Sequence, residues 1–245
     1  MSSSVHLAQD LIRTWQTSAS PGLTDQPPPA RALPTEQVVS LAGPGRPPAQ
    51  LNLEQTLRRR RSLRFFAQSP LPAAHVGEVI TAGLAEEKQG RDQQEAELPE
   101  LEITIAALRV EGLDRGFHQI TPSTQTAAKI AVDFDPSALE SLTLQAEFAD
   151  AAVIISLGAD LAAAEARAGT HGYRLLMGRV SAAAYAMWLQ GVSRGWVGSV
   201  FAGLLPAALR QPVASDGTSR HQLFALALGP PPKVPANAAP DPSES

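Results

Sequence analysis

The spacing of apolar residues along the chain predicts a mixture of helices and strands. Apolar side chains that recur every three or four residues indicate amphipathic helices, and the Asp-Pro pair at 135–136 is typical of a helix start. The predicted helices cover 5–15, 53–61, 72–84, 135–147 and 161–192, the last interrupted near 169–172. In 173–192 apolar residues occupy more than one side of the helix, which places it in a core or at an obligate dimer interface.

Other segments have the patterns of strands. Residues 101–105 alternate apolar and polar side chains, the period of a strand with one wetter face. Residues 110–118 contain two glycines and predict the turn of a hairpin. Residues 151–157 and 222–228 are short, mostly apolar runs followed by glycine, so we expect buried strands there. Between 86 and 102, seven acids and two bases predict a mobile loop or an exposed helix.

Proline divides the chain into a folded centre and two tails. Of the 21 prolines, eight lie in the first 48 residues and six in the last 16. Repeated proline removes backbone donors and disfavours helix, so 21–50 is predicted to be an extended linker. We expect the short helix within 1–20, one folded domain over 51–232 and a disordered tail over 233–245.

Composition narrows the classes of function. The net charge of -4 and a sequence pI of about 5.7 argue against a nucleic-acid-binding protein. Without cysteine there is no disulfide framework, thiolate nucleophile or Cys-ligated zinc, so any redox chemistry comes from a bound cofactor. The start of the chain lacks a basic region followed by an apolar one, and no apolar run approaches the roughly 20 residues of a membrane span. We therefore expect a cytoplasmic protein with neither nucleic acid nor membrane as a partner.

The chain nevertheless has one concentrated basic segment. Five arginines lie within the seven positions 58–64, and Ser62 stands among them. Guanidinium groups hold a phosphate by forked, charge-assisted hydrogen bonds, and Ser62 adds a hydroxyl and a backbone donor. An arginine run of this kind is also typical of a solvated helix end. Composition alone leaves both interpretations open.

The order of residues in this segment resembles the opening motif of the nitroreductase superfamily of flavin enzymes. Arg-Arg-Ser-x-Arg-x-Phe from Arg60 is followed by Pro-Leu a few residues later. The resemblance implies that Arg60, Arg61, Ser62 and Arg64 hold the phosphate and ribityl chain of FMN. It also suggests that a buried strand starts at 65–66.

The second half of the chain strengthens the resemblance, which spans roughly 53–232. The order of strand, long helix, Gly-rich turn, helix and final strand is similar to that superfamily. Gly172-Tyr173-Arg174, Gly178, Tyr185 and Gly195-Trp196-Val197-Gly198 look most like its azoline dehydrogenase branch, the SagB-type enzymes. The resemblance implies an α+β fold in which a central, mostly antiparallel sheet is flanked by helices, with a long central helix at the dimer interface.

The branch oxidises thiazolines and oxazolines in ribosomally made peptides to thiazoles and oxazoles. The resemblance therefore implies an FMN-dependent oxidoreductase with a peptide substrate, a homodimeric state and a complex with a cyclodehydratase. It further implies that Gly195, Trp196, Gly198 and Lys233 contact the cofactor. Glycine at 195 would let the backbone approach a flat ring and offer an N–H to it. A helix C-cap with Trp196 in the core explains the same residues, and Lys233 is equally a solvated tail charge.

Two departures from the branch concern catalysis. No Pro-Ser-x-Gly loop is recognisable in the acidic stretch at 85–99, and Arg167 and Ala168 occupy the positions of the usual Lys-Tyr pair. Arginine is a poor base because its pKa stays above about 12. His171, assisted by Tyr173, is the nearest substitute base, although a histidine there is also typical of a surface or capping residue. No His, Asp or Glu spacing indicates a metal site.

These departures leave two alternative functions open. One is a degenerate or partner-dependent subunit that keeps the fold but docks a peptide or a modifying enzyme. The other is a general NAD(P)H-dependent nitro- or quinone reductase, which shares the cofactor.

Overall fold

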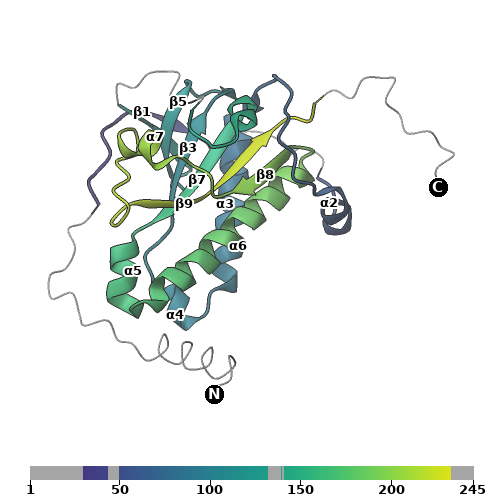
Figure 1. The fold of residues 1–245 in the computed structure, drawn as a ribbon. Helices are drawn as coiled ribbons and strands as arrows, with labels where there is room; N and C mark the ends of the chain where they lie inside the picture. The colour runs from purple at the N-terminus through teal and green to yellow at the C-terminus, as the bar shows by residue number, and fades with distance from the viewer. Residues whose placement is uncertain (1–29, 44–49, 132–138, 140, 233–245) are drawn as a thin grey trace, which may run out of the picture.

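The computed structural model describes residues 30–43, 50–131, 139 and 141–232, and these form an α+β fold around one large sheet (Figure 1). The sheet has seven strands in the order β1-β6-β5-β3-β7-β9-β8, and all neighbouring pairs are antiparallel. Its strands are β1 Thr35–Ser40, β3 Glu102–Ala107, β5 Gly116–Thr121, β6 Thr126–Ile130, β7 Val153–Ala159, β8 Val197–Phe201 and β9 His221–Gly229. A separate parallel pair joins β2 Leu71–Pro72 to β4 Val110–Glu111. The predicted fold class is confirmed.

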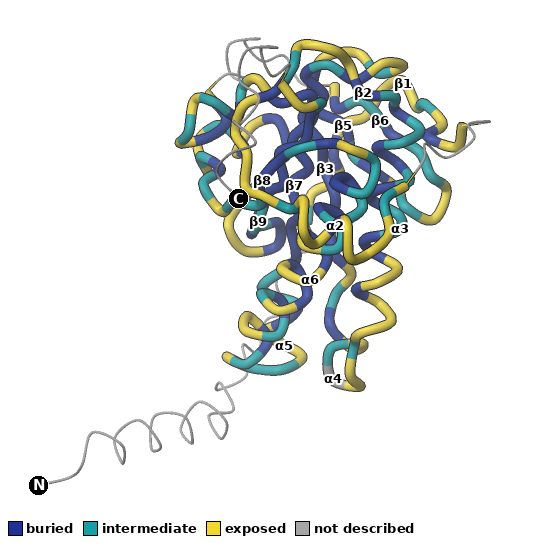
Figure 2. Tube along the Cα trace, turned by 90° about the vertical axis from the view of Figure 1, so that its right-hand side faces the viewer, coloured by how far each residue is buried: buried dark blue, intermediate teal, exposed yellow. Residues whose placement is uncertain are grey.

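Helices complete the described part of the fold. They are α2 Leu53–Arg59, α3 Ala73–Gly90, α4 Gln93–Ala96, α5 Leu161–Ala168, α6 His171–Ser193 and α7 Pro206–Arg210, with a 3-10 turn at Ala146–Asp150. Helices α3 and α6 pack against each other, and α4 and α5 lie at the far end of this pair, away from most of the sheet (Figures 1 and 2). The long helix α6 therefore forms the axis of the helical layer.

Two apolar cores lie on the two faces of the sheet. The larger contains Ile105 and Ile155 of the central strands together with side chains of α3 and α6. The smaller contains Ile154 and Phe148 with side chains from α7. Because β7 contributes to both cores, every residue of this strand is buried, as its continuous apolar run predicts. Figure 2 shows this buried centre in dark blue.

The apolar side chains of α6 are largely buried within a single chain. Leu176, Val180 and Met187 have no measurable exposure, and α3 covers this side of the helix. Of the two alternatives that the sequence predicts for this helix, the core is therefore confirmed for these residues. The exposed residues of α6 instead form a stripe of mostly small or aromatic side chains that includes Gly178, Ala182 and Tyr185.

Four further local predictions differ from the structure. Residues Thr35–Ser40 form strand β1, although the sequence predicts an extended linker over 21–50. Phe65 and Phe66 belong to no strand: Phe65 is exposed, and only Phe66 is buried, next to Gly229.

The other two concern helix boundaries. α3 continues to Gly90, beyond its predicted end at 84, and α4 follows it. The helical alternative for the acidic stretch is thus confirmed, but Glu87 is buried instead of exposed. Residues 141–145 form turns and a bridge instead of the predicted helix over 135–147. The predicted helix at 5–15 and the tail at 233–245, which includes Lys233, lie outside the described residues.

Candidate functional site

The arginine segment lies where α2 meets the edge of the sheet. Asn52 caps α2 by accepting a hydrogen bond from Gln55 N at 2.9 Å, and Gln55 Oε1 accepts one from Asn52 N at 3.2 Å, which completes a capping box. The helix ends at Arg59, and the chain then turns into an extended conformation at Arg60. The next residues run along β8, the edge strand, where Leu63 N donates to Gly198 O at 3.1 Å. The fold thereby fixes the backbone of Ser62 beside Gly198.

The arginines of this segment differ in their partners. Arg58 forms an exposed ion pair with Glu54 at 2.8 Å. The guanidinium of Arg60 lies 4.9 Å from the ring centre of Trp188 and 5.8 Å from that of Tyr185, both on α6. Such cation-π contacts orient the group without neutralising its charge. Arg61 and Arg64 are exposed and form no ion pair within the described ranges.

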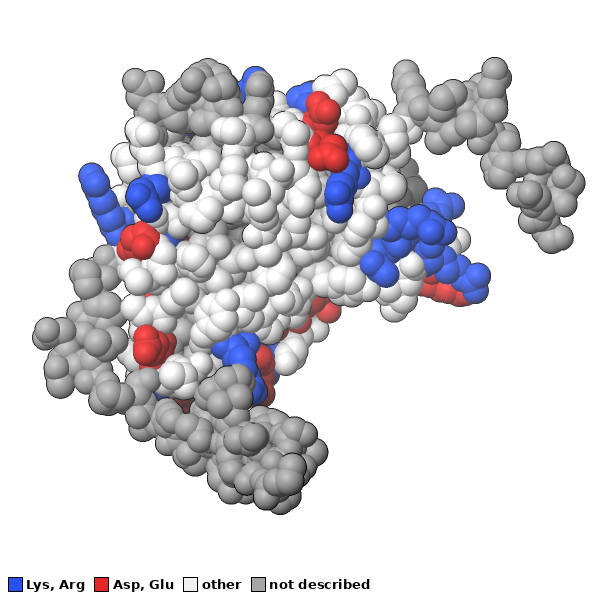
Figure 3. Space-filling view, in the orientation of Figure 1, with Lys and Arg blue, Asp and Glu red and all other residues white. Residues whose placement is uncertain are grey.

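The result is a local concentration of positive charge. Figure 3 shows the basic side chains gathered over α2 and the residues after it. Uncompensated guanidinium groups this close repel one another, and a phosphate would offset that repulsion. The donors around them fit a phosphorylated ligand. Ser62 Oγ lies 3.3 Å from Ser199 Oγ, and the buried Trp188 Nε1 has no hydrogen-bond partner in the part of the chain described. The residues present are therefore compatible with the phosphate end of FMN.

The residues at the end of α6 have clear structural roles. Gly195 has φ +82° and donates its N–H to Val192 O at 2.9 Å, while Trp196 N donates to Gly191 O at 3.0 Å. This pair of bonds is a Schellman motif, and the buried Trp196 joins the larger core. A Cβ at Gly198 would collide with the carbonyl oxygen of Ala227 on β9. The C-cap interpretation thus explains Gly195, whose N–H is already engaged.

The candidate base lies far from the arginine segment within one chain. His171 is the first residue of α6, and Trp188, which contacts Arg60, follows 17 residues later on the same helix. At a rise of 1.5 Å per residue, the separation along the helix axis is about 25 Å. Tyr173 is exposed at the same end as His171. Within a single chain, His171 and Tyr173 cannot act on a ring whose phosphate is held by Arg60.

Sequence reasoning gave no site role to the two aromatic rings beside Arg60, those of Tyr185 and Trp188, which we call the aromatic floor of the site. Tyr185 and Trp188 lie three residues apart on α6 and form an edge-to-face pair with ring centres 6.1 Å apart. The apolar pattern over 173–192 explains Trp188 as a core residue, and Tyr185 enters only through the branch resemblance. The signal available in the sequence was the i, i+3 aromatic pair, which places both rings on one side of a helix.

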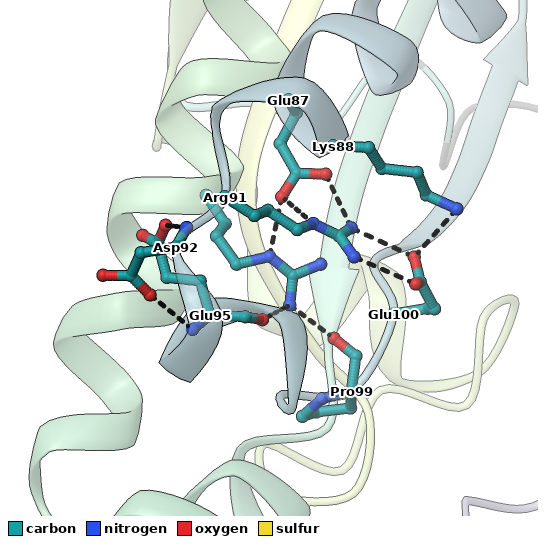
Figure 4. A network of polar contacts seen from close by, with 8 residues as sticks. Glu87, Lys88, Arg91, Asp92, Glu95, Pro99 and Glu100 are labelled. Carbon is teal, nitrogen blue, oxygen red and sulfur yellow. Dashed lines mark hydrogen bonds and ion pairs between the residues drawn. The ribbon is translucent and has the colours of Figure 1, made fainter.

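A buried ionic network occupies the acidic stretch where the Pro-Ser-x-Gly loop was not recognised (Figure 4). Arg91 Nη2 donates to Glu87 Oε2 at 2.7 Å, and Arg179 Nε of α6 donates to Glu87 Oε1 at 2.7 Å. Arg91 also pairs with Glu100 at 3.0 Å. Hydrogen bonds from Arg91 lower the pKa of Glu100 to about 2 despite some burial. The ion pair between Glu87 and Arg179 in this network links α3 to α6.

Neither a metal centre nor a membrane-spanning helix is found among the described residues. They contain no group of three or more His, Cys, Asp or Glu side chains arranged to hold a metal ion. None of their helices is long and apolar enough to cross a membrane.

The sequence matches the Nitroreductase family over residues 57–229, which is more than half of the chain. The chain therefore belongs to the nitroreductase family, as the arginine motif and the order of elements predict. No curated protein matches the sequence in a direct comparison.

Solved structures show the same fold. A protein from Anabaena variabilis assigned as a nitroreductase is 21% identical with a TM-score of 0.63, and the match covers 80% of this chain but only 42% of that longer chain. The Escherichia coli microcin synthetase McbBCD complex with truncated pro-MccB17 bound matches at 14% identity and a TM-score of 0.60, covering 95% of each chain. A protein from Staphylococcus epidermidis assigned as an NAD(P)H:FMN oxidoreductase matches at 12% identity and a TM-score of 0.51, covering 80% of this chain and 98% of that one.

Proposed function

We propose that this protein is an FMN-dependent oxidoreductase that dehydrogenates thiazoline or oxazoline rings in a ribosomally made peptide. The observation that carries the proposal is the placement of Arg60, Ser62 and Arg64 at the edge of β8, beside the rings of Tyr185 and Trp188 and without an acidic partner among the described residues. Membership of the nitroreductase family supports the oxidoreductase part. The peptide part is supported by the azoline dehydrogenase motifs and by similarity to a synthetase that was solved with a peptide bound.

Some residues of the proposed site would bind the phosphate, and others orient the residues that bind it. Arg60, Arg61 and Arg64 would hold the phosphate, with Ser62 as an additional donor. Stacking on Trp188 and Tyr185 restrains the guanidinium of Arg60, so less freedom is lost when the phosphate binds. FMN, when bound, supplies the two-electron acceptor that the cysteine-free chain lacks.

Ring oxidation also requires a group that takes a proton from the substrate. Because His171 and Tyr173 lie about 25 Å from the arginine segment along α6, they would serve a cofactor held by a second copy of the chain. The proposal therefore includes a homodimer in which each active site draws residues from both chains. A cyclodehydratase that makes the azoline would be the partner that supplies the substrate.

The cofactor is tested by the absorbance spectrum of the purified protein and by FMN titration of variants. Arg64→Ala and Arg60→Ala each remove a charge-assisted contact worth about 1.5–3 kcal/mol, so the Kd for FMN should rise at least tenfold. Arg58→Ala is the matched control, because Arg58 pairs with Glu54 and should leave the Kd within about twofold. Retention of FMN at wild-type affinity in both test variants would reject the assignment.

The reaction is tested with a flavin-loaded protein and a thiazoline-containing peptide. Loss of a general base reduces turnover by roughly a hundredfold or more, so His171→Ala should do so at unchanged flavin content. Unchanged turnover would remove His171 from the site. Rapid NAD(P)H oxidation with nitro or quinone acceptors, and none with the peptide, would assign a general reductase instead.

Two observations favour a second candidate function. The described residues of a single chain leave the candidate base His171 far from the arginine segment, and an ionic network occupies the region of the missing loop. A partner-dependent subunit that docks a peptide or a modifying enzyme needs neither a base beside the arginine segment nor the Pro-Ser-x-Gly loop. Flavin-loaded protein that turns over the peptide only after addition of a cyclodehydratase would support this candidate.

A further inference from the structure

A second serine lies next to Ser62 at the edge of the sheet. Ser199, in the middle of β8, is 7% exposed, whereas Ser62 is an exposed residue. Leu63 N donates to Gly198 O at 3.1 Å, and Ser62 forms a bridge with Gly198, so the backbone holds the two serines side by side. Ser199 Oγ donates to Ser62 Oγ at 3.3 Å. An exposed serine therefore has a buried hydroxyl group within reach.

The hydroxyl group of Ser199 has two acceptors for its single proton. Val200 O also lies 3.3 Å from Ser199 Oγ, so the two acceptors are equally distant. When Ser199 donates to Val200 O, the Ser62 hydroxyl can donate to Ser199 Oγ, and its lone pairs then face outward. When Ser199 donates to Ser62 Oγ, the Ser62 proton is free to point outward. A group outside the protein can therefore select between two arrangements.

An anion beside Ser62 selects the second arrangement. The lone pairs of a hydroxyl oxygen repel a phosphate, whereas its proton binds a phosphate oxygen in a charge-assisted hydrogen bond. Hydroxyl groups that donate in one direction along a chain polarise one another and strengthen each bond. Arg60, Arg61 and Arg64 flank Ser62 and supply the positive charge that attracts an anion to this position.

We propose that Ser199 is a positioning residue of the phosphate site. Its hydroxyl group donates to Ser62 Oγ and thereby turns the Ser62 proton towards a phosphate oxygen. Ser199 does not touch the ligand itself. That the phosphate belongs to FMN rests on the proposed function, whereas the chain of two hydroxyl groups needs only a phosphate group.

A double-mutant cycle tests this chain. The Kd for FMN is measured on the full-length protein by quenching of flavin fluorescence. Because loss of one hydrogen bond changes an equilibrium constant about two- to tenfold, Ser199→Ala should raise the Kd about three- to fivefold. In a Ser62→Ala background the same change should alter the Kd by less than about 1.5-fold, since the acceptor is gone. Equal effects in the two backgrounds, or no rise in the Kd with Ser199→Ala alone, would overturn the proposal.

Ser156→Ala is the matched control. Ser156 of β7 is 5% exposed, and its hydroxyl group donates to Gln222 Oε1 at 2.5 Å. The substitution removes a buried hydroxyl group from the same sheet without altering the partner of Ser62, so the Kd for FMN should stay within about 1.5-fold. A rise as large as that of Ser199→Ala would assign the effect to a general loosening of the sheet and would contradict the positioning role.

Inorganic phosphate separates this inference from the proposed function. Its binding is followed through the backbone amides of Leu63 and Gly198 in ¹⁵N-labelled protein, for the wild type and the three variants of the cycle. If the protein binds no FMN but its phosphate affinity depends jointly on Ser62 and Ser199, the positioning role stands and the proposed function is rejected. FMN binding without coupling between the two serines rejects the positioning role alone. Binding of neither FMN nor phosphate rejects both.

Discussion

At the scale of single residues, Glu87 shows how strongly one buried charge can hold two elements together. Its carboxylate accepts from Arg91 of its own helix and from Arg179 of α6, and its side chain is 1% exposed. Removing one member of such a pair leaves a buried, uncompensated charge. Glu87→Gln should therefore lower the free energy of unfolding by about 3 kcal/mol, measured by urea denaturation with tryptophan fluorescence.

The neighbouring Glu86 provides the control for this change. It has the same charge one position earlier, but it is exposed and forms no ion pair with any described residue. Glu86→Gln should change the free energy of unfolding by less than about 0.5 kcal/mol. Equal effects of the two substitutions would show that the network contributes nothing specific.

A second residue-scale prediction concerns His118, whose side chain lies in the sheet with 1% exposure. Burial lowers its pKa, and the nearby Lys129 adds to this effect. As pH falls below about 6.5, the unfolded state binds a proton that the folded state does not accept. Stability should then fall by up to about 1.4 kcal/mol per pH unit because of this group.

The measurement compares wild type with His118→Gln between pH 7.5 and 5.5. The stability of the variant should depend less steeply on pH than that of the wild type, because the variant lacks the titrating group. Parallel curves for the two proteins would mean that His118 titrates alike in the folded and unfolded states.

The residue scale is also where sequence reasoning was weakest. Glu87 belongs to a run of acids, and such a run usually forms a solvated face, so nothing in the pattern separates it from Glu86. Its burial depends on Arg179, 92 positions later, which the fold brings into contact. The arginine motif could be recognised because its residues are adjacent in sequence. The aromatic floor was missed because it comes from a distant helix.

At the scale of elements, the packing of α3 on α6 depends on a glycine. A Cβ at Gly83 would lie 2.9 Å from the backbone nitrogen of Met187, closer than normal contacts allow, and would also meet the Met187 side chain. Because backbone cannot move aside as a flexible side chain can, Gly83→Ala should force the helices apart. We expect a loss of about 1–3 kcal/mol in the free energy of unfolding.

Gly178 on α6 is the matched control for this prediction. The nearest atom to an added Cβ there is Glu95 Oε1, at 3.9 Å, so the methyl group fits. Alanine is the better helix former, and Gly178→Ala should stabilise the protein by about 0.5–1 kcal/mol. If chemical denaturation shows the two variants changing stability in the same direction, the close helix contact at Gly83 is not what limits packing.

Elements with a strong internal pattern were predicted well. The strands β3, β7 and β9 and the helix pair α5–α6 follow directly from alternation, continuous apolar runs and a glycine interruption. β1 was missed because it is an edge strand with mostly exposed side chains, so its stability comes from pairing with β6. The residues of β1 themselves do not indicate that another strand pairs with them.

At the scale of the whole molecule, the single chain leaves large apolar side chains exposed around the arginine segment. Leu57, Leu63 and Phe65 are 45%, 37% and 67% exposed, and the exposed stripe of α6 ends nearby at Tyr185. The sequence predicted dimerisation from the apolar circumference of α6, but that surface is covered by α3. The apolar surface still available to a second copy is the patch of Leu57, Leu63 and Phe65 beside the proposed cofactor site.

The last prediction is therefore a homodimer that depends on this patch. Light scattering at micromolar concentration should give twice the chain mass of 25.8 kDa. Phe65→Asp places a charge among the apolar residues of the patch and should shift the protein towards monomer, with loss of FMN because the proposed site is completed from both chains. Leu144→Asp is the control, since Leu144 is 70% exposed but pairs with Gly203, away from α2. A wild-type mass of one chain, or equal dissociation in both variants, would reject this interface.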